Sequence, residues 1–421
     1  MAQIRRGGRP AFAGKVKKAF GLVLALPFYA LAVPAVIVIR LIRPWFLIRL
    51  GFPNVGCFGH FAIDMELYAC ERDAGINRPM RRHVDFLYMP ESPCNQQLAV
   101  MWRRAFLFWP SWMLAPLCRV DRLIPGEKIP GCGESVQGDR DVHNLLDRFP
   151  PHLEFTPEEE ARGEAGLRGM GIPRGKPFVC LNVRDSAWNA FFNQTESYEN
   201  EQSYRNTDVQ NYILAAEALA DRGYVVVRMG AIVREEIRTA HPGVIDYATN
   251  GMRSDFMDIY LGAKCSFCVS TGSGFDAVPM IFRRPVAFVN FVPLVHLHTF
   301  SAKILAITQR CQLAGNGHEL SLREIFARGA WLVESRSDDL ASGIRLVENT
   351  PEEIRDLALE MAERLEGTWK PQVEDEDLQK RFWRLFPRNA PGFDRGRRWH
   401  GEIRARFGAA FLRANRAWLD R

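Results

Sequence analysis

The chain has 421 residues, of which 47% are hydrophobic and 25% are charged. This composition is typical of a globular protein, and the length suffices for two ordinary domains. The net charge is +6, but the aromatic and basic signature of RNA-binding surfaces is missing, so nucleic acid is not an expected partner. The nine cysteines lack regular spacing. Cys265 and Cys268 form a CxxC inside an apolar run without a second pair for zinc, and we expect reduced thiols.

A run without charged residues extends from Phe20 to Ile39. As a helix it would measure about 30 Å, roughly the thickness of the hydrocarbon layer of a membrane. Basic residues flank it on both sides, so a straight span would leave one basic cluster outside. We therefore expect residues 15–43 to attach the chain to the cytoplasmic face of the inner membrane, as an interfacial, re-entrant or spanning helix. The alternative is a helix buried against the domain or a partner.

Strands and helices alternate between residues 45 and 170. Strands are expected at residues 45–50, 84–89 and 119–124, and helices at residues 61–70 and 95–108. A further helix start is marked by Thr156, Pro157 and Glu159, which supply an N-cap, a first-turn proline and a capping-box glutamate. The alternation predicts an α/β domain with a mostly parallel sheet.

A second α/β domain is expected over residues 171–350. Its strands are predicted at residues 178–183, 224–229, 244–246, 265–269 and 285–289, and its helices at residues 208–222, 256–263 and from 277 onward. Residues 351–421 have the charged and aromatic character of helices that pack across both domains. Residues 1–44 form a separate basic and hydrophobic segment. The fold class predicted is α/β, with two domains and an N-terminal hydrophobic helix.

The loop between strand 265–269 and the following helix consists mainly of small residues. Its members are Ser270, Thr271, Gly272, Ser273, Gly274 and Asp276. Such a loop collects free backbone N–H groups at the positive end of a helix, an arrangement suited to a phosphate or diphosphate. The alternative is a plain tight turn.

Charged residues follow two other strands of the same domain. Arg184 and Asp185 come after strand 178–183, and Arg228 lies near the end of strand 224–229. Ligands of open parallel sheets gather at the carboxyl ends of the strands, and an arginine there can grip two oxygens of a diphosphate. Surface ion pairs are the alternative for each arginine.

Tyr204, Arg205 and Asn206 precede the expected helix at residues 208–222. Thr207 or Asp208 would cap that helix, but capping leaves the three preceding residues unexplained. We expect these three side chains to reach a base, a ribose or a sugar hydroxyl.

His60 lies between the first strand and its helix, with Asp64 one helical turn further on. This spacing puts both residues on one helix face, so Asp64 can orient the imidazole as a general base. The alternative is a histidine bonded locally at a helix start. His296 and His298 are weaker candidates for the same cleft.

The acidic run at residues 374–377 contains a DxD pattern, which some transferases use for metal. It is far from any strand end, and we interpret it as a solvated charge run. The motifs HExxH, GxSxG, GxGxxG and the P-loop are absent from the sequence, which argues against proteases, esterases, NAD enzymes of the usual type and kinases.

Four longer stretches resemble a family of bacterial glycosyltransferases associated with cell-surface polysaccharides. They are residues 179–188, 204–208, 223–230 and 273–285, and the resemblance also includes residues 48–51 with Gly59 and His60. It implies a GT-B fold, in which two Rossmann-like domains face a cleft and the second binds a nucleotide-sugar. The stretch 181–185 is also similar to the HxRxxD-like strand end of fucosyltransferase-type enzymes, with Asn182 in place of the histidine. Trp188 stands where the family has tyrosine.

The resemblance implies transfer of a sugar from a nucleotide-diphosphate donor to a hydroxyl on a glycan, lipid-linked or protein acceptor, without metal or another cofactor. Arg184, Asp185, Arg228 and the loop at 270–276 would hold the diphosphate, and residues 204–206 would position the donor. Two alternatives stay open, a non-catalytic scaffold with a degenerate cleft and an epimerase-like nucleotide-sugar enzyme.

Overall fold

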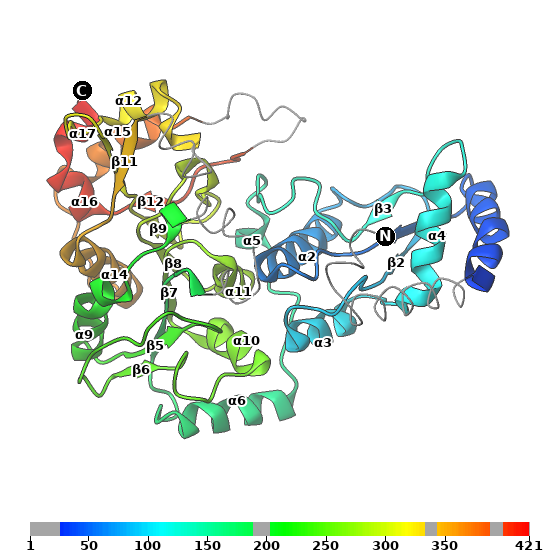
Figure 1. The fold of residues 1–421 in the computed structure, drawn as a ribbon, viewed down its shortest axis with the longest axis horizontal. Coiled ribbons are helices and arrows are strands. Elements are labelled where there is room, and N and C mark those ends of the chain that lie inside the picture. The colour runs from blue at the N-terminus through cyan, green and yellow to red at the C-terminus, as the bar shows by residue number, and fades with distance from the viewer. Residues whose placement is uncertain (1–25, 188–202, 333–342, 388–398, 421) are drawn as a thin grey trace, which may run out of the picture.

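The computed structural model describes residues 26–187, 203–332, 343–387 and 399–420. These residues form two lobes that lie side by side, each built on its own parallel sheet (Figure 1). Trp188 and the basic N-terminal residues before position 26 lie outside the described residues. The α/β class predicted from the sequence is confirmed by the two parallel sheets.

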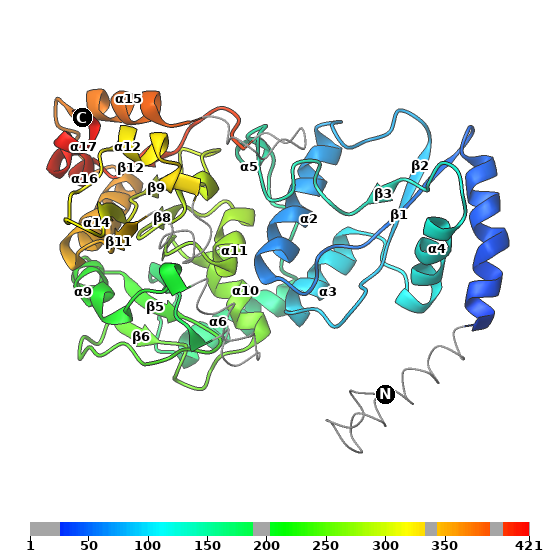
Figure 2. The same ribbon diagram turned by 45° about the horizontal axis from the view of Figure 1, so that its top comes forward.

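The first lobe contains a three-stranded sheet in the order β2-β1-β3, with every pair parallel. Its strands are β1 (Leu47–Gly51), β2 (His83–Leu87) and β3 (Gly131–Cys132). Its helices are α2 (Phe58–Asp73), α3 (Gln96–Ala105), α4 (Ser111–Leu123) and α5 (Leu145–Arg148). In both ribbon views α2 and α3 lie between this sheet and the second lobe, and α4 covers the opposite side (Figures 1 and 2).

The prediction of a strand at residues 119–124 is wrong, because these residues belong to α4 and the turn after it. Pro116 obscured the helix in the sequence, since a proline inside a helix removes one backbone hydrogen bond. Leu114 and Val120 are nevertheless buried by α4. The third strand is instead the two-residue β3, which is too short for a periodic signal.

The second lobe contains a seven-stranded parallel sheet in the order β12-β9-β8-β7-β4-β5-β6. Its strands are β4 (Phe178–Asn182), β5 (Val225–Met229), β6 (Val244–Asp246), β7 (Phe267–Ser270), β8 (Val286–Phe288), β9 (Ile304–Ala306) and β12 (Arg406–Phe407). A separate antiparallel pair is formed by β10 (Arg310–Leu313) and β11 (Ile344–Val347). All five strands predicted for this domain are present, because each is a short apolar run bounded by turn residues.

Helices cover both faces of the larger sheet (Figure 1). They are α6 (Pro157–Gly169), α9 (Ile213–Asp221), α10 (Asp255–Lys264), α11 (Ala277–Ile281), α12 (Leu322–Ala327), α14 (Pro351–Glu366), α15 (Asp375–Leu385), α16 (Ala409–Ala414) and α17 (Arg416–Asp420). Short 3₁₀ turns are η1 (Ser203–Arg205), η2 (Val209–Tyr212), η3 (Gly274–Asp276), η4 (Leu294–His296) and η5 (Ala330–Leu332). The capping box expected at Thr156 is present, and two more occur at Ser321 and Thr350.

The C-terminal helices pack on the second lobe, where α14 contacts α9 and α16. In the described part of this region, residues 399–404 contact the first lobe. There Asn144 donates to the carbonyl of Glu402, and the Arg404 guanidinium pairs with Asp147. Helix α6 bridges the lobes, because Glu159 binds Gln97 and Arg104 of α3 while Glu160 binds Lys264 of α10.

The two lobes are joined through α2, which packs against α11 and η3. A buried ion pair crosses this contact, where Arg283 Nη2 lies 2.6 Å from Glu66 Oε1 and Glu66 is fully buried. The same guanidinium donates to the carbonyls of Phe149 and Pro150. These bonds tie the turn after α11 to both α2 and the chain that leads to α6.

The predicted N-terminal hydrophobic helix is described from residue 26 onward, and residues 26–42 are helical. Ala32 and Val36 are buried against Val120 of α4, and Arg40 forms an ion pair with Asp121. Among the described residues, no helix is both long enough and apolar enough to cross a membrane.

Replacement of Arg283 tests the ion pair between the lobes. Arg283→Ala leaves Glu66 buried without its charge partner, so the free energy of unfolding should fall by about 3–5 kcal/mol in denaturant titrations. Arg222→Ala is the matched control, because Arg222 likewise forms ion pairs, with Glu363 and Glu366, but its side chain is 30% exposed. A change of about 1 kcal/mol or less is expected there. Equal losses in the two variants would contradict a special role for the buried pair.

Candidate active site

The loop of residues 270–276 is held in shape by a buried carboxylate. Asp276 accepts hydrogen bonds from the hydroxyl of Ser270 and from the backbone N–H of Ser273. Asn182, paired with Ser270 across β4 and β7, donates to Ser270 Oγ, Ser273 Oγ and Asp276 Oδ1. Burial raises the pKa of Asp276 to about 6, although these hydrogen bonds oppose the increase. Ser270 and Asp276 therefore stabilise the conformation of the loop from its buried side, and their side chains are not exposed to a ligand.

Gly272 forms the bend of this loop and needs a glycine. Its φ of 81° lies in the left-handed region, and a Cβ atom there would be 2.8 Å from the ring of Phe291. Arg205 donates to the carbonyl oxygen of Gly272, and Thr271 Oγ1 accepts from the backbone N–H of Arg184 at 3.0 Å. The loop is thus joined to both of the predicted arginines.

Arg184, Arg205 and Asn206 lie together, as the sequence predicted. Arg184 Nε lies 3.3 Å from Asn206 Oδ1, and the backbone N–H of Thr207 bonds to the carbonyl of Arg184 at 3.1 Å. Both arginine residues are partly exposed. They place two positive charges beside the bend at Gly272, which is the charge that a diphosphate requires.

The start of α2 meets the same loop from the first lobe. A Cβ at Gly59 would lie 3.0 Å from the Cα of Gly274, and a Cβ at Gly274 would lie 3.0 Å from the backbone nitrogen of Gly59. The N-cap residue Cys57 makes no side-chain cap, and the first turn of α2 has no acidic residue. The first N–H groups of this 16-residue helix therefore lie without a side-chain cap at the loop, at the positive end of the helix. The helix predicted after the loop, α11, has only five residues, so α2 is the longer dipole here.

His60 and Asp64 form the predicted pair on one face of α2. His60 Nδ1 lies 3.2 Å from Asp64 Oδ2, and the His60 side chain is 44% exposed. The hydrogen bond with Asp64 raises the pKa of His60 above its usual 6.5, and Asp139 adds to the increase against the effect of burial. An imidazole held through Nδ1 has its Nε2 atom available for proton transfer.

Asp139 and Arg140 also belong to the site, and the sequence reasoning missed them. Arg140 Nη2 lies 2.7 Å from His296 Nδ1, and its guanidinium stacks on Trp399 with 4.6 Å to the ring centroid. The pKa of Asp139 is lowered by Arg140, His298 and His60 against the effect of burial. Both residues come from a stretch rich in Gly, Pro and Asp that resembles an ordinary loop, and functional residues are frequent in such loops.

His296 and His298, the weaker candidates from the sequence, both lie near Arg140. Burial, together with the charge of Arg140, lowers the pKa of His296 to about 3 and that of His298 to about 4. Both imidazoles are therefore neutral near pH 7.

Arg228 is placed differently from the prediction. Its side chain is fully buried, with Nη1 3.3 Å from Asp246 Oδ1 and Nη2 4.0 Å from Asp185 Oδ2. Asp185 in turn accepts hydrogen bonds from the backbone N–H groups of Ala187 and Arg234. In this structure Arg228 and Asp185 join the ends of β4, β5 and β6, and the Arg228 guanidinium presents no surface to a donor. Strand spacing could not show that Arg228 points into the lobe.

Tyr204 was predicted to position the donor together with Arg205 and Asn206, and Asp208 was a predicted helix cap. Asp208 caps η2 by accepting from the backbone N–H of Gln210, as the capping alternative stated. Tyr204 is half-buried beside Thr308, Gln309 and Trp331. The structure thus brings Arg205 and Asn206 to the loop, while Tyr204 lies toward the β10–β11 side.

Two clusters that contain acidic residues bear on metal binding. Glu66, Cys70 and His152 offer ligand atoms within 4.8 Å of one another, and Arg283 Nη2 already lies 2.6 Å from Glu66 there. Burial lowers the pKa of His152, but hydrogen bonds with Cys70, Glu66 and Asp73 outweigh this effect and raise that pKa to about 10. The DxD residue Asp375 is buried and paired with Arg413, so the interpretation as a solvated run is wrong for Asp375.

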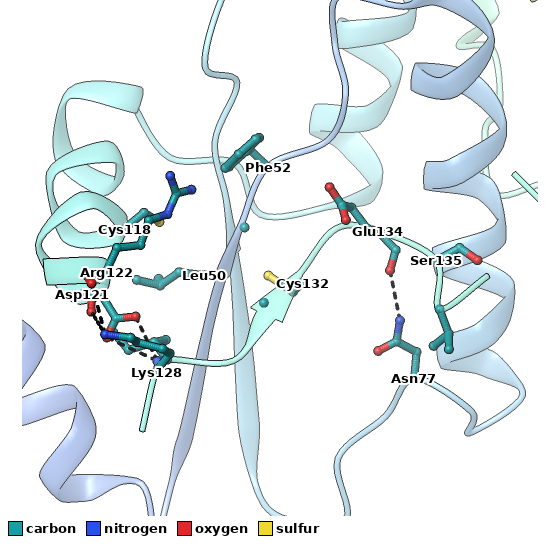
Figure 3. A pocket seen from close by; sticks show the side chains of 14 residues that line it. Leu50, Phe52, Asn77, Cys118, Asp121, Arg122, Lys128, Cys132, Glu134 and Ser135 are labelled. Atoms are coloured by element: carbon teal, nitrogen blue, oxygen red, sulfur yellow. Dashed lines mark hydrogen bonds between the residues drawn. The ribbon is translucent and has the colours of Figure 1, made fainter. Parts of the chain in front are cut away.

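A cavity of about 500 Å³ lies in the first lobe between α4, the end of β1 and the chain after β3 (Figure 3). Arg122 and Lys128 contribute positive charge to it, and Asp121 and Glu134 contribute negative charge. Asp121 also binds Arg40, so α4 connects this cavity with the N-terminal helix. None of the site residues predicted from the sequence lines it.

No family model and no curated protein matches the chain. Among solved structures, it is similar to the ADP-heptose lipopolysaccharide heptosyltransferase II of E. coli, with 14% identity, a TM-score of 0.41, and coverage of 76% of this chain and 98% of that one. A glycosyl transferase of family 9 from Veillonella parvula matches with 11% identity, a TM-score of 0.36 and coverage of 57% and 79%. The iron-containing dodecameric glycosyltransferase TibC from enterotoxigenic E. coli matches with 13% identity, a TM-score of 0.29 and coverage of 60% and 59%. At these scores the likeness decides neither the topology nor the activity of the present chain.

Proposed function

We propose that this chain is a glycosyltransferase that moves a sugar from a nucleotide-diphosphate donor to an acceptor hydroxyl in bacterial surface glycan assembly. The observation that carries the proposal is the meeting of two lobes at the loop of residues 270–276. Arg184 and Arg205 lie on one side of the loop, and the start of α2 with His60 lies on the other. A site for an anion and a candidate base thus occur side by side.

The charges in this site suit the departure of a diphosphate. When the bond between the sugar C1 and the diphosphate oxygen breaks, its electron pair remains on the diphosphate and negative charge develops there. The guanidinium groups of Arg184 and Arg205 would offset that charge, and the backbone N–H groups at the start of α2 would add donors. Asn206 would hold Arg184 in place through the 3.3 Å contact with its Nε atom.

His60 would accept the proton of the acceptor. The acceptor oxygen forms the new bond to C1 and releases its proton to His60 Nε2, while Asp64 holds the ring through Nδ1 and stabilises the resulting imidazolium. Asp139 would stabilise the same positive charge, since its carboxylate also raises the pKa of His60. In this proposal the acceptor is a glycan, a lipid-linked sugar or a protein hydroxyl at the cytoplasmic face of the inner membrane.

Ligand-induced stabilisation tests the donor site. The wild-type protein should gain thermal stability with one of UDP, GDP, dTDP, ADP or CMP, by about 2.7 kcal/mol at a ligand concentration 100-fold above Kd. Arg184→Ala should remove this gain without lowering the stability of the free protein, because Arg184 is partly exposed.

Arg174→Ala is the matched control for that experiment, since Arg174 lies on the same lobe with an 82% exposed side chain. It should respond to the nucleotide like the wild type. A gain that survives in Arg184→Ala would remove the diphosphate from this site. No response of the wild type to any of the five nucleotides would favour the non-catalytic scaffold.

The pH dependence of transfer tests the base. His60 must be neutral to accept a proton, so kcat/KM should rise with pH through a midpoint above 6.5, the direction in which Asp64 moves the pKa of His60. Asp64→Asn should move this midpoint to lower pH, and His60→Gln should lower kcat by about 10²–10⁴.

His241→Gln serves as the control, because His241 pairs with Asp221 on the surface of the second lobe. Its rate and midpoint should equal those of the wild type. A midpoint that Asp64→Asn leaves unchanged would show that another group is the base. Nucleoside diphosphate released without any acceptor would instead favour an enzyme that does not transfer the sugar.

A further inference from the structure

The N-terminal helix, residues 26–42, exposes an apolar face that the other described residues leave uncovered. We propose that this face binds the surface of a lipid bilayer with anionic headgroups. It is called the docking face here and consists of Leu26, Leu31, Val33, Ile37, Val38 and Leu41, with exposed fractions between 43% and 68%. An exposed apolar area of this kind indicates a binding surface.

One side of this helix packs on the first lobe and the other side is exposed. Ala32 and Val36 are at most 3% exposed and pack on α4. With about 100° of rotation per residue, Leu31 and Val38 occupy the side away from α4. No charged residue occurs between positions 26 and 39, so the outer side has no polar stripe. The helix is held to the lobe at one end by the pair of Phe28 and Trp112, whose ring centroids are 5.1 Å apart, and at the other by Arg40 and Asp121.

Exposed tryptophans mark both ends of the helix. Trp112 is 56% exposed beside Phe28, and Trp45, three residues beyond the helix, is 76% exposed. Tryptophan prefers the boundary between headgroups and hydrocarbon, because its ring is apolar and its N–H needs a polar partner. This distribution fits a helix that lies along the membrane surface.

Charge identifies the occupant as an anionic bilayer. The first acidic residue of the whole sequence is Asp64, and nine Lys and Arg residues precede it. Three of the nine, Arg40, Arg43 and Arg49, pair with carboxylates of the first lobe, and the other six all come before position 20. Basic residues near an anionic surface each contribute about 1 kcal/mol of attraction. A second copy of the chain would bring the same positive segment against this one, so like charges disfavour self-association through this face. The second lobe lies at the far end of the molecule from the helix (Figure 2), so docking leaves that lobe away from the bilayer.

Flotation of the full-length, detergent-purified chain with vesicles tests the proposal. The wild type should float with vesicles of phosphatidylcholine and phosphatidylglycerol, and less with phosphatidylcholine alone. The double variant Leu31→Glu/Val38→Glu loses two apolar side chains and gains two negative charges, so its partition should fall at least tenfold, on the order expected from burial of two such side chains. Both positions are exposed, so melting temperatures should stay equal.

Met252→Glu/Leu365→Glu is the matched control, because both residues are exposed apolar side chains of the second lobe. It should float like the wild type. Flotation of the docking-face variant at the wild-type level would overturn the proposal, as would equal binding of the wild type to both kinds of vesicle. A wild-type dimer that the docking-face variant converts to a monomer in sedimentation velocity would also overturn it in favour of a second copy.

Discussion

The buried ion pair of Glu66 and Arg283 is the interaction on which the relation of the two lobes depends. Glu66 is fully buried on α2 and Arg283 belongs to the turn after α11. Arg283 adopts a φ of 61°, a conformation that costs about 1–2 kcal/mol for a residue with a Cβ. The guanidinium offsets this cost, because it bonds to the buried carboxylate and to three backbone carbonyls, those of Phe149, Pro150 and Ile281. Since α2 also carries His60, the same contact that joins the lobes fixes the candidate base relative to the loop.

Close approach at the loop depends on two glycines that belong to different lobes. Gly59 is the second residue of α2 and Gly274 is the first of η3, and any side chain at either position would meet the backbone of the other. Their contact brings the start of α2, which lacks a side-chain cap, to the loop of residues 270–276. Arg184 and Arg205 are hydrogen-bonded to the same loop. The proposed anion site is therefore shared between the lobes, whereas the sequence indicated a site confined to the second one. The dipole of α2, from the first lobe, adds positive potential at the loop that the five-residue α11 is too short to supply.

The sequence predicted the parts of the fold and site that depend on local patterns. Apolar runs bounded by turn residues predicted the strands of the second sheet, and the spacing of four residues predicted the contact of His60 with Asp64. What it could not predict depends on packing. Arg228 alternates along β5 like its neighbours, and only the assembled sheet shows that it points to Asp246. Asp139 and Arg140 lie in irregular chain, where no periodicity relates a residue to distant partners such as Trp399. The position of β3 is equally hidden, because two residues carry no pattern.

The histidines around the loop have different pKa values because their environments differ. Burial and the charge of Arg140 lower the pKa of His296 to about 3 and that of His298 to about 4. The hydrogen bond with Asp64 raises the pKa of His60. A group with a pKa near 3 is neutral at physiological pH but takes up a proton poorly, whereas a histidine paired with a carboxylate takes it up readily. His296 Nδ1 is further engaged with Arg140. The positions of one carboxylate and one guanidinium, rather than the number of histidines, therefore favour His60 as the proton acceptor.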